Sequence, residues 1–199
     1  MKHVYVETNF VIDLLRPFAS KGARALRARH GQDLTLHVPW CSLTEAKRTL
    51  EAIIREDLGF VDNAGRFLGQ LGAAADPTNR AMQTEVRRFL QSARDARLQA
   101  LFDFPDRLEA LARDVDILQP SPRAAQLTVD LFRRKALKPF DEMVLGAVLA
   151  DAELRRAAGE GPLYLCNLNT RDFEPTSGND LVAEYARVGL TYVSTFDVP

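Results

Sequence analysis

Four acidic residues stand beside apolar segments, in settings that would let their carboxylates act together: Glu7, Glu45, Asp141 and Asp172. Clustered carboxylates repel one another and raise one another's pKa unless a cation compensates their charge. A ligand set made only of oxygen atoms favours Mg²⁺ or Mn²⁺. Such a metal activates water and stabilises in-line displacement at a phosphodiester. The four residues are therefore candidates for a metal-dependent hydrolytic site.

Each acid also has a purely structural interpretation. Ser42 and Glu45 have the spacing of a capping box, in which the two residues cap a helix reciprocally. Asp141 stands where a helix N-cap is expected, and Asp172 lies in a polar stretch typical of turns. Glu7 is harder to explain in this way, because a carboxylate that ends an apolar strand is costly unless it is solvated or paired. Taken singly, the structural interpretations are favoured for the other three, and only the joint placement of all four favours a site.

The scaffold for these acids alternates short β-forming runs with helical segments. Strands are predicted at Val4–Val6, Leu34–Val38, Val115–Leu118, Leu163–Cys166 and Leu190–Val193. Helices are predicted from Ser20 to Arg29, from Ser42 to Arg55, from Ser121 to Arg134 and from Phe140 to Ala158. Strands separated by helices indicate an α/β fold, with a parallel sheet of about four to five strands flanked by helices.

The middle of the chain, about 56–115, is helical and contains no predicted strand apart from the run that begins at its end. Phe104-Pro105 predicts a break within it. Because no linker flanks this segment, we expect one domain over 1–199 with a helical insertion. The carboxyl ends of parallel strands share one edge of a sheet, where ligands collect, so we expect the four acids to meet at that edge.

Composition indicates an ordinary globular protein of 199 residues, with 46% apolar and 27% charged residues. No apolar run is long enough to span a bilayer, and no secretory segment is recognised at the beginning of the sequence, so we expect no membrane role and a cytoplasmic location. Cys41 and Cys166 are too few for a disulfide framework, and no Cys/His cluster has zinc spacing. The net charge of −1 does not indicate nucleic-acid binding, although the acids can mask a local basic patch.

Four segments, in this order along the chain, resemble the motifs of the PIN-domain family: Val4–Asn9, Val38–Glu45, Phe140–Ala147 and Asn167–Phe173. The first ends a strand in an acid followed by Thr-Asn, and the second places a Glu in a helix that follows a Pro. The third opens an apolar helix with an Asp, and the fourth finishes in Asp-Phe. The family comprises Mg²⁺- or Mn²⁺-dependent ribonucleases and includes many toxins of bacterial toxin–antitoxin pairs.

The resemblance implies a role for each matching residue. Glu7, Asp141 and Asp172 would bind the metal, and Glu45 would complete the acidic site or orient the water. Hydrolysis of RNA by in-line attack would then leave a 5′-phosphate and a 3′-hydroxyl. The residues that would support the metal or contact the substrate are Thr8, Asn9, Asn169 and Arg171. An RNA substrate and an antitoxin protein are the implied partners.

Two positions depart from the family's pattern. Glu7 stands where the family has Asp, and its extra methylene moves the carboxylate outward, which matters to a metal that demands near-ideal octahedral geometry. Asn169 stands where some members offer a further acid, so Asp172 must supply the fourth charge. A catalytically weak PIN fold that binds RNA or a protein is therefore the alternative. A phosphatase with an aspartyl nucleophile is disfavoured, because position 7 is Glu and no second Asp follows two residues later.

Other features bear on substrates and partners. Basic residues precede Asp141 and are candidates for contact with RNA phosphates: Arg133, Arg134, Lys135 and Lys138. Trp40 and Phe173 flank the motifs, Trp40 as a candidate for base stacking and Phe173 as a core residue. The helical middle has more apolar residues than a thin layer needs, namely Phe60, Phe67, Leu68, Leu71, Phe89, Leu98, Leu101 and Phe102. We expect them to build a homodimer interface or an antitoxin-binding groove.

Overall fold

The computed structural model describes residues 1–16, 19–72, 77–134, 136–176 and 181–199, with the side chains of 71, 72 and 77–80 left out. Lys135 and the side chain of Leu71 therefore lie outside the described residues. The chain divides into two compact units, one made of Met1–Ala46 with Leu108–Pro199 and the other of Lys47–Arg107.

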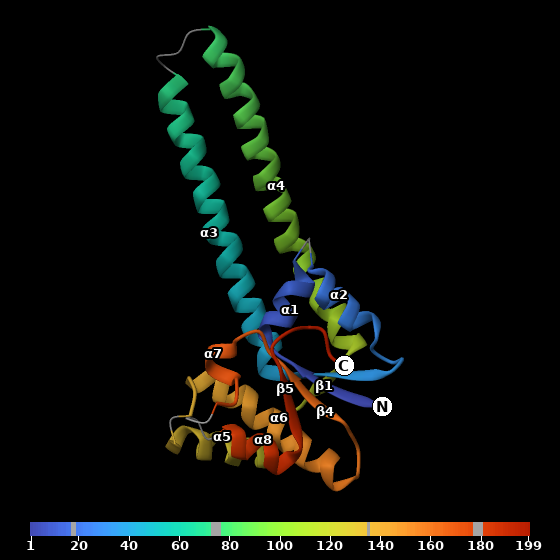
Figure 1. The fold of residues 1–199 in the computed structure, drawn as a ribbon. Coiled ribbons are helices and arrows are strands. Elements are labelled where there is room, and N and C mark those ends of the chain that lie inside the picture. The colour runs from blue at the N-terminus through green and yellow to red at the C-terminus, as the bar shows by residue number, and fades with distance from the viewer. Residues whose placement is uncertain (17–18, 73–76, 135, 177–180) are drawn as a thin grey trace. The chain divides into compact units, whose positions relative to one another are not determined.

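The first unit is built on a parallel five-stranded sheet in the order β3-β2-β1-β4-β5 (Figure 1). The strands are β1 (Lys2–Val6), β2 (Leu34–Pro39), β3 (Asp116–Leu118), β4 (Leu163–Cys166) and β5 (Leu190–Val193). In register, β1 places Tyr5 opposite His37 of β2 and Val6 opposite Cys166 of β4. The predicted α/β class and all five predicted strands are confirmed, because short runs of β-branched and apolar residues are what a buried parallel strand requires.

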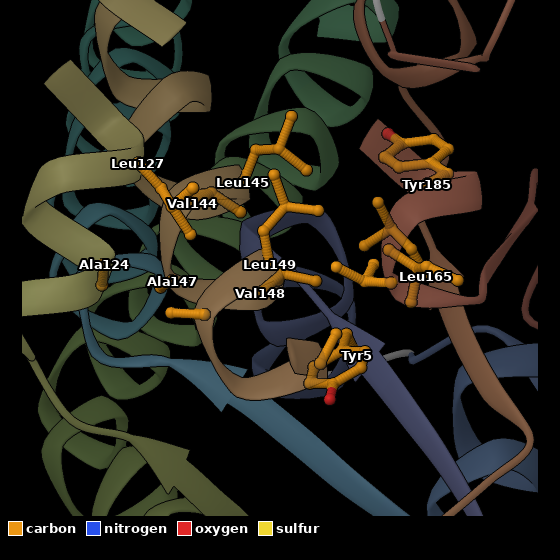
Figure 2. Packing of buried hydrophobic residues seen from close by; sticks show 14 of the residues in the cluster. Tyr5, Ala124, Leu127, Val144, Leu145, Ala147, Val148, Leu149, Leu165 and Tyr185 are labelled. Atoms are coloured by element: carbon orange, nitrogen blue, oxygen red, sulfur yellow. The ribbon is translucent and has the colours of Figure 1, made fainter. Parts of the chain in front are cut away.

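Helices cover the sheet. They are α1 (Thr8–Leu15), α2 (Lys21–Ala28), α5 (Pro122–Arg134), α6 (Pro139–Ala157), α7 (Thr170–Phe173) and α8 (Leu181–Val188). The main apolar cluster joins α5, α6 and α8 to β1 and β4, and Figure 2 shows Leu145 and Leu149 of α6 between Leu165 and the neighbouring helix. The C-terminal segment packs on α1, where the ring of Phe196 meets Phe10 edge to face at 5.3 Å.

Glycine lets α5 and α6 pack closely. A Cβ atom at Gly146 would lie 2.2 Å from Oγ1 of Thr128 and 3.0 Å from the backbone oxygen of Ala124. Both neighbours belong to α5, so the two helices approach at a point where a side chain does not fit. This contact seats α6, and hence the residues of its first turn, against the rest of the unit.

A polar cluster joins β1 and β2 to α6. His3 and His37 are in hydrogen-bond contact at 3.0 Å between Nδ1 and Nε2. Tyr5 donates to Asp151 at 2.8 Å, and Asp151 also accepts from Arg155 at 2.6 Å. Burial, reinforced by the charge of Arg155, lowers the pKa of His37 to about 3. The two imidazoles are therefore neutral in the folded protein at neutral pH.

The second unit consists of parts of two long helices, α3 (Trp40–Gly72) and α4 (Pro77–Asp114). Arg97 pairs with Asp57 at 2.8 Å and Arg94 with Asp62 at 3.4 Å, so the two helices run antiparallel side by side (Figure 1). The predicted break at Phe104-Pro105 is wrong, because α4 continues through Pro105. Proline removes one backbone hydrogen bond, and the burial of Phe104 beside it favours the continued helix.

No helix formed by the described residues combines the length and apolar character that crossing a membrane requires.

Candidate functional site

The strand order changes direction between β1 and β4, since β2 and β3 follow on one side of β1 and β4 and β5 on the other. In open α/β sheets the crevice for a ligand forms at the carboxyl ends of the strands that flank such a switch point. Val6 and Cys166 are register partners, so the next residues on these neighbouring strands are Glu7 and Asn167. The first predicted acid is thus placed at the switch point.

Glu7 is buried there, with 8% of its surface exposed. Its pKa is raised to about 7, mainly by burial and in smaller part by the charges of Asp141 and Glu45, while hydrogen bonding with Asn9 opposes the shift. A carboxyl with this pKa is only partly ionised at neutral pH. The cause is chiefly desolvation, which a bound cation or a proton would offset.

Glu45 lies near Glu7 and does not cap its helix. The capping box predicted from Ser42 is wrong, because α3 begins two residues earlier, at Trp40, and Ser42 is already inside its first turn. The carboxylate of Glu45 instead accepts a hydrogen bond of 2.6 Å from the hydroxyl of Thr8. This contact joins the first two motifs across 37 residues of sequence.

Asp141 occupies the first turn of α6 and is not its N-cap, a position that Lys138 takes. Burial raises the pKa of Asp141 to about 6, with the charge of Asp172 as the second cause and that of Glu45 also contributing. Lys138 opposes the shift. Asp141 is thus within electrostatic reach of acids from each of the other three motifs, since its charge also raises the pKa of Glu7.

Asp172 differs from the other acids because its charge is already compensated. It accepts hydrogen bonds from Nδ2 of Asn169 at 2.8 Å and from Nζ of Lys138 at 3.3 Å. These contacts lower its pKa, Asn169 having the largest effect. Arg171, whose charge also lowers this pKa, is exposed beside it.

Asn167 is a residue that the sequence analysis did not select. It is fully buried at the end of β4, and its side-chain nitrogen has no hydrogen-bond partner among the described residues. The buried hydroxyl of Ser42, at the start of α3, also has no hydrogen-bond partner among the described residues. Asn167 follows Cys166 as Glu7 follows Val6, so the rule that selected the residue after a strand would have found it.

The fit of a metal depends on the donors that the crevice offers. Within the described ranges, no three acidic, histidine or cysteine side chains approach closely enough to hold one metal ion. Mg²⁺, however, usually keeps several waters and is held by one or two carboxylates. Glu7 and Asp141 are carboxylates with raised pKa values. Their oxygens fit a hydrated hard cation, and they do not form an all-protein cage.

An apolar cavity of about 360 Å³ adjoins the first turns of α3 and α6. Its lining includes Trp40, Phe132 and Met143, each between 38% and 40% exposed. Phe173 is buried, as expected of a core residue. Of the two aromatic residues that flank the motifs, only Trp40 is accessible to a ligand.

A comparison of the chain with models of known protein families and with curated proteins finds no match. The fold defines the class of the protein: an α/β protein with a parallel sheet, in which Glu7 follows a strand at the point where the strand order changes direction.

Proposed function

We propose that this protein is a ribonuclease that uses Mg²⁺ or Mn²⁺ to hydrolyse RNA phosphodiester bonds. The observation that carries the proposal is the electrostatic influence of Glu7, Glu45 and Asp141 on one another, with the pKa values of Glu7 and Asp141 raised toward neutrality. Raised carboxyl pKa values in a crevice are typical of sites that bind cations or transfer protons. The order of the four motifs supports RNA as the substrate through the resemblance to PIN-domain ribonucleases.

In this proposal Glu7 and Asp141 would hold a hydrated metal, Asp172 would contact it through one of its waters, and Glu45 would orient the attacking water. Bound Mg²⁺ or Mn²⁺ would lower the pKa of water and neutralise the charge that develops on the phosphate. The hydroxyl of Thr8 fixes one oxygen of Glu45, which leaves the other available to accept a hydrogen bond from water.

Substrate contacts follow from the exposed groups around the crevice. Arg171 and Lys138 flank Asp172 and offer positive charge to RNA phosphates. Trp40 offers an exposed ring on which a base can stack, a contact that tolerates any sequence. An antitoxin protein as partner and a cytoplasmic location belong to the same proposal, and the resemblance to toxins of toxin–antitoxin pairs supports them.

A cleavage assay tests the proposal. Wild-type protein is incubated with single-stranded RNA of mixed sequence in Mn²⁺, in Mg²⁺ and in a chelator. We expect products with 5′-phosphates that require the metal, and their loss in Asp141→Asn. Glu109→Gln removes an exposed acid whose partner is Arg113 and should leave cleavage unchanged. RNA that stays intact with wild-type protein in both metals would overturn the proposal.

The alternative is a catalytically weak PIN fold that binds RNA or a protein. The contact of Asp172 with Lys138 favours it, because an internal cation already compensates one of the three acids proposed to contact the metal. Glu7 favours it too, since its side chain is longer than the Asp of the family. Binding of the same RNA without cleavage, and with equal affinity in chelator, would support this alternative.

A further inference from the structure

The helical hairpin formed by residues 47–72 and 77–107 has little core of its own. None of its described side chains between 55 and 103 is buried. Ion pairs of Arg97 with Asp57 and of Arg94 with Asp62 connect its helices. Long helices in water owe most of their stability to tertiary packing of an apolar face. Because these two helices bury so little apolar surface, we expect them to pack against a further layer of protein.

Four of the exposed apolar residues of the hairpin gather on one of its faces. Phe60 and Phe67 each precede by one residue a half-buried position of α3, Val61 and Leu68. Phe89 stands in the same relation to half-buried Leu90 of α4. The half-buried residues form the seam, the line along which the two antiparallel helices contact each other. A residue that precedes a seam residue by one position lies on the same side of the pair in both helices, because reversing a helix also reverses the sense in which its residues turn around the axis.

Met82 extends this face, since it lies seven residues before Phe89 and so at the same angle on α4. We name the set the phenylalanine face: Phe60, Phe67, Met82 and Phe89. Their exposed fractions are 72%, 61%, 62% and 71%. An aromatic side chain buries roughly 150–250 Å², so this face leaves roughly 500 Å² of apolar surface in water. Monomeric soluble proteins rarely expose larger contiguous patches.

The opposite face of the hairpin is polar and charged. It carries a groove of about 680 Å³, and three arginines and an aspartate are among its lining residues: Arg66, Arg87, Arg94 and Asp62. A layer packed there would have to desolvate these charges, which is costly unless each is paired. The hairpin is thus amphipathic across its two faces, with a polar face suited to water and an apolar face suited to burial.

We propose that the phenylalanine face is a dimer interface with a second copy of this chain. Pairing two such faces buries roughly 1,000 Å² from these side chains alone, which is the area a specific interface needs. A two-fold axis presents the same face from both copies, so that each covers the other. Two helical hairpins become a four-helix bundle, which has the enclosed apolar core that one hairpin lacks.

The test compares the oligomeric state of three proteins by light scattering and sedimentation over a range of concentrations. Wild-type protein should be a dimer. Phe67→Glu/Phe89→Glu places two charges in the interface and should raise the dimer dissociation constant at least about a hundredfold, the loss expected from two interfacial aromatic anchors. Both residues are largely exposed within one chain, so the variant should keep the helical content of the wild type.

Phe102→Glu is the matched control. Phe102 is 74% exposed and follows Leu101 of the seam by one residue, which places it on the groove side of the hairpin. This variant should remain dimeric. A wild type that stays monomeric at its highest soluble concentration would overturn the proposal. So would a Phe67→Glu/Phe89→Glu variant as dimeric as the wild type, or equal weakening by Phe102→Glu.

Discussion

At the scale of single residues, Glu7 is a carboxyl buried directly after β1. Its pKa of about 7 and that of Asp141 at about 6 lie above the ordinary carboxyl range, so the folded protein binds more protons than the unfolded chain. Such groups stabilise the fold below their unfolded pKa values near 4, and this contribution is lost as the pH rises through the folded values.

We therefore predict that Glu7→Gln changes how stability depends on pH. Without divalent metal, the Glu7 contribution should fall by on the order of 2 kcal/mol between about pH 5 and pH 7.5 in the wild type, and this fall should be missing in the variant. The measurement is denaturant unfolding in chelator across that range. Identical pH profiles for the two proteins would show that burial does not raise the pKa of Glu7.

The pH profile of the variant must be subtracted from that of the wild type, because histidines change the free energy of unfolding with pH in the opposite direction. His3 and His37 have lowered pKa values in the fold, mainly through burial, with Arg155 as the second cause. The unfolded chain takes up protons at these residues below about pH 6.5 and the folded protein does not, so their contribution is lost as the pH falls. Subtracting the Glu7→Gln profile removes this shared effect.

At the scale of elements, the contact between α5 and α6 seats the helix that carries Asp141. Gly146→Ala places a methyl group against Thr128 Oγ1 and the backbone of Ala124, so the helices must separate. We predict a loss of about 1–3 kcal/mol in the free energy of unfolding, as for overpacked cores. Chemical denaturation measures it.

Gly59→Ala is the control for that substitution. Gly59 lies in α3, and a Cβ added there meets no described atom within 4 Å. The free energy of unfolding should rise by about 0.5–1 kcal/mol, because alanine favours the helix. Equal effects of the two substitutions would mean that the close approach at Gly146 carries no energetic weight.

The strands were predictable because each is a short apolar run ended by turn residues, and burial in a parallel sheet leaves few alternatives. The starts of the helices were less predictable. Ser121 caps its helix as the pattern indicates, through a 3.1 Å bond from the backbone of Ala124, whereas Ser42 does not. The reason is tertiary. Glu45 is engaged by Thr8, a residue far away in sequence, and local capping rules contain no such competitor.

The candidate site was predictable to a similar extent. That Glu7 and Asp141 approach one another follows from strand ends sharing an edge, which the alternation of elements already indicates. The contact of Lys138 with Asp172 does not follow, because it depends on how the start of α6 and the short helix α7 are placed relative to each other. Nor does the lack of a partner for Asn167, which only a full account of hydrogen bonds reveals.

At the scale of the whole molecule, two units with different physical needs share one chain. The first closes a sheet with helices on a large apolar cluster. The second is a hairpin in which Phe60, Phe67 and Phe89 remain largely in water within a single chain. The expected single domain over 1–199 stays a prediction, and the dimer experiment addresses the second unit independently of any metal or RNA.

The central claim concerns the first unit: its acidic crevice is a site for a divalent cation. Calorimetric titration and melting of the wild type and of Asp141→Asn with Mn²⁺ test it most directly. We expect the wild type to bind Mn²⁺ and to gain about 2.7 kcal/mol at a hundredfold excess over the dissociation constant. Asp141→Asn should be more stable without metal, because a repelling charge is gone, and should lose most of the gain. Absence of any heat of binding, with melting curves that saturating Mn²⁺ does not move, would contradict the metal site and with it the proposed ribonuclease.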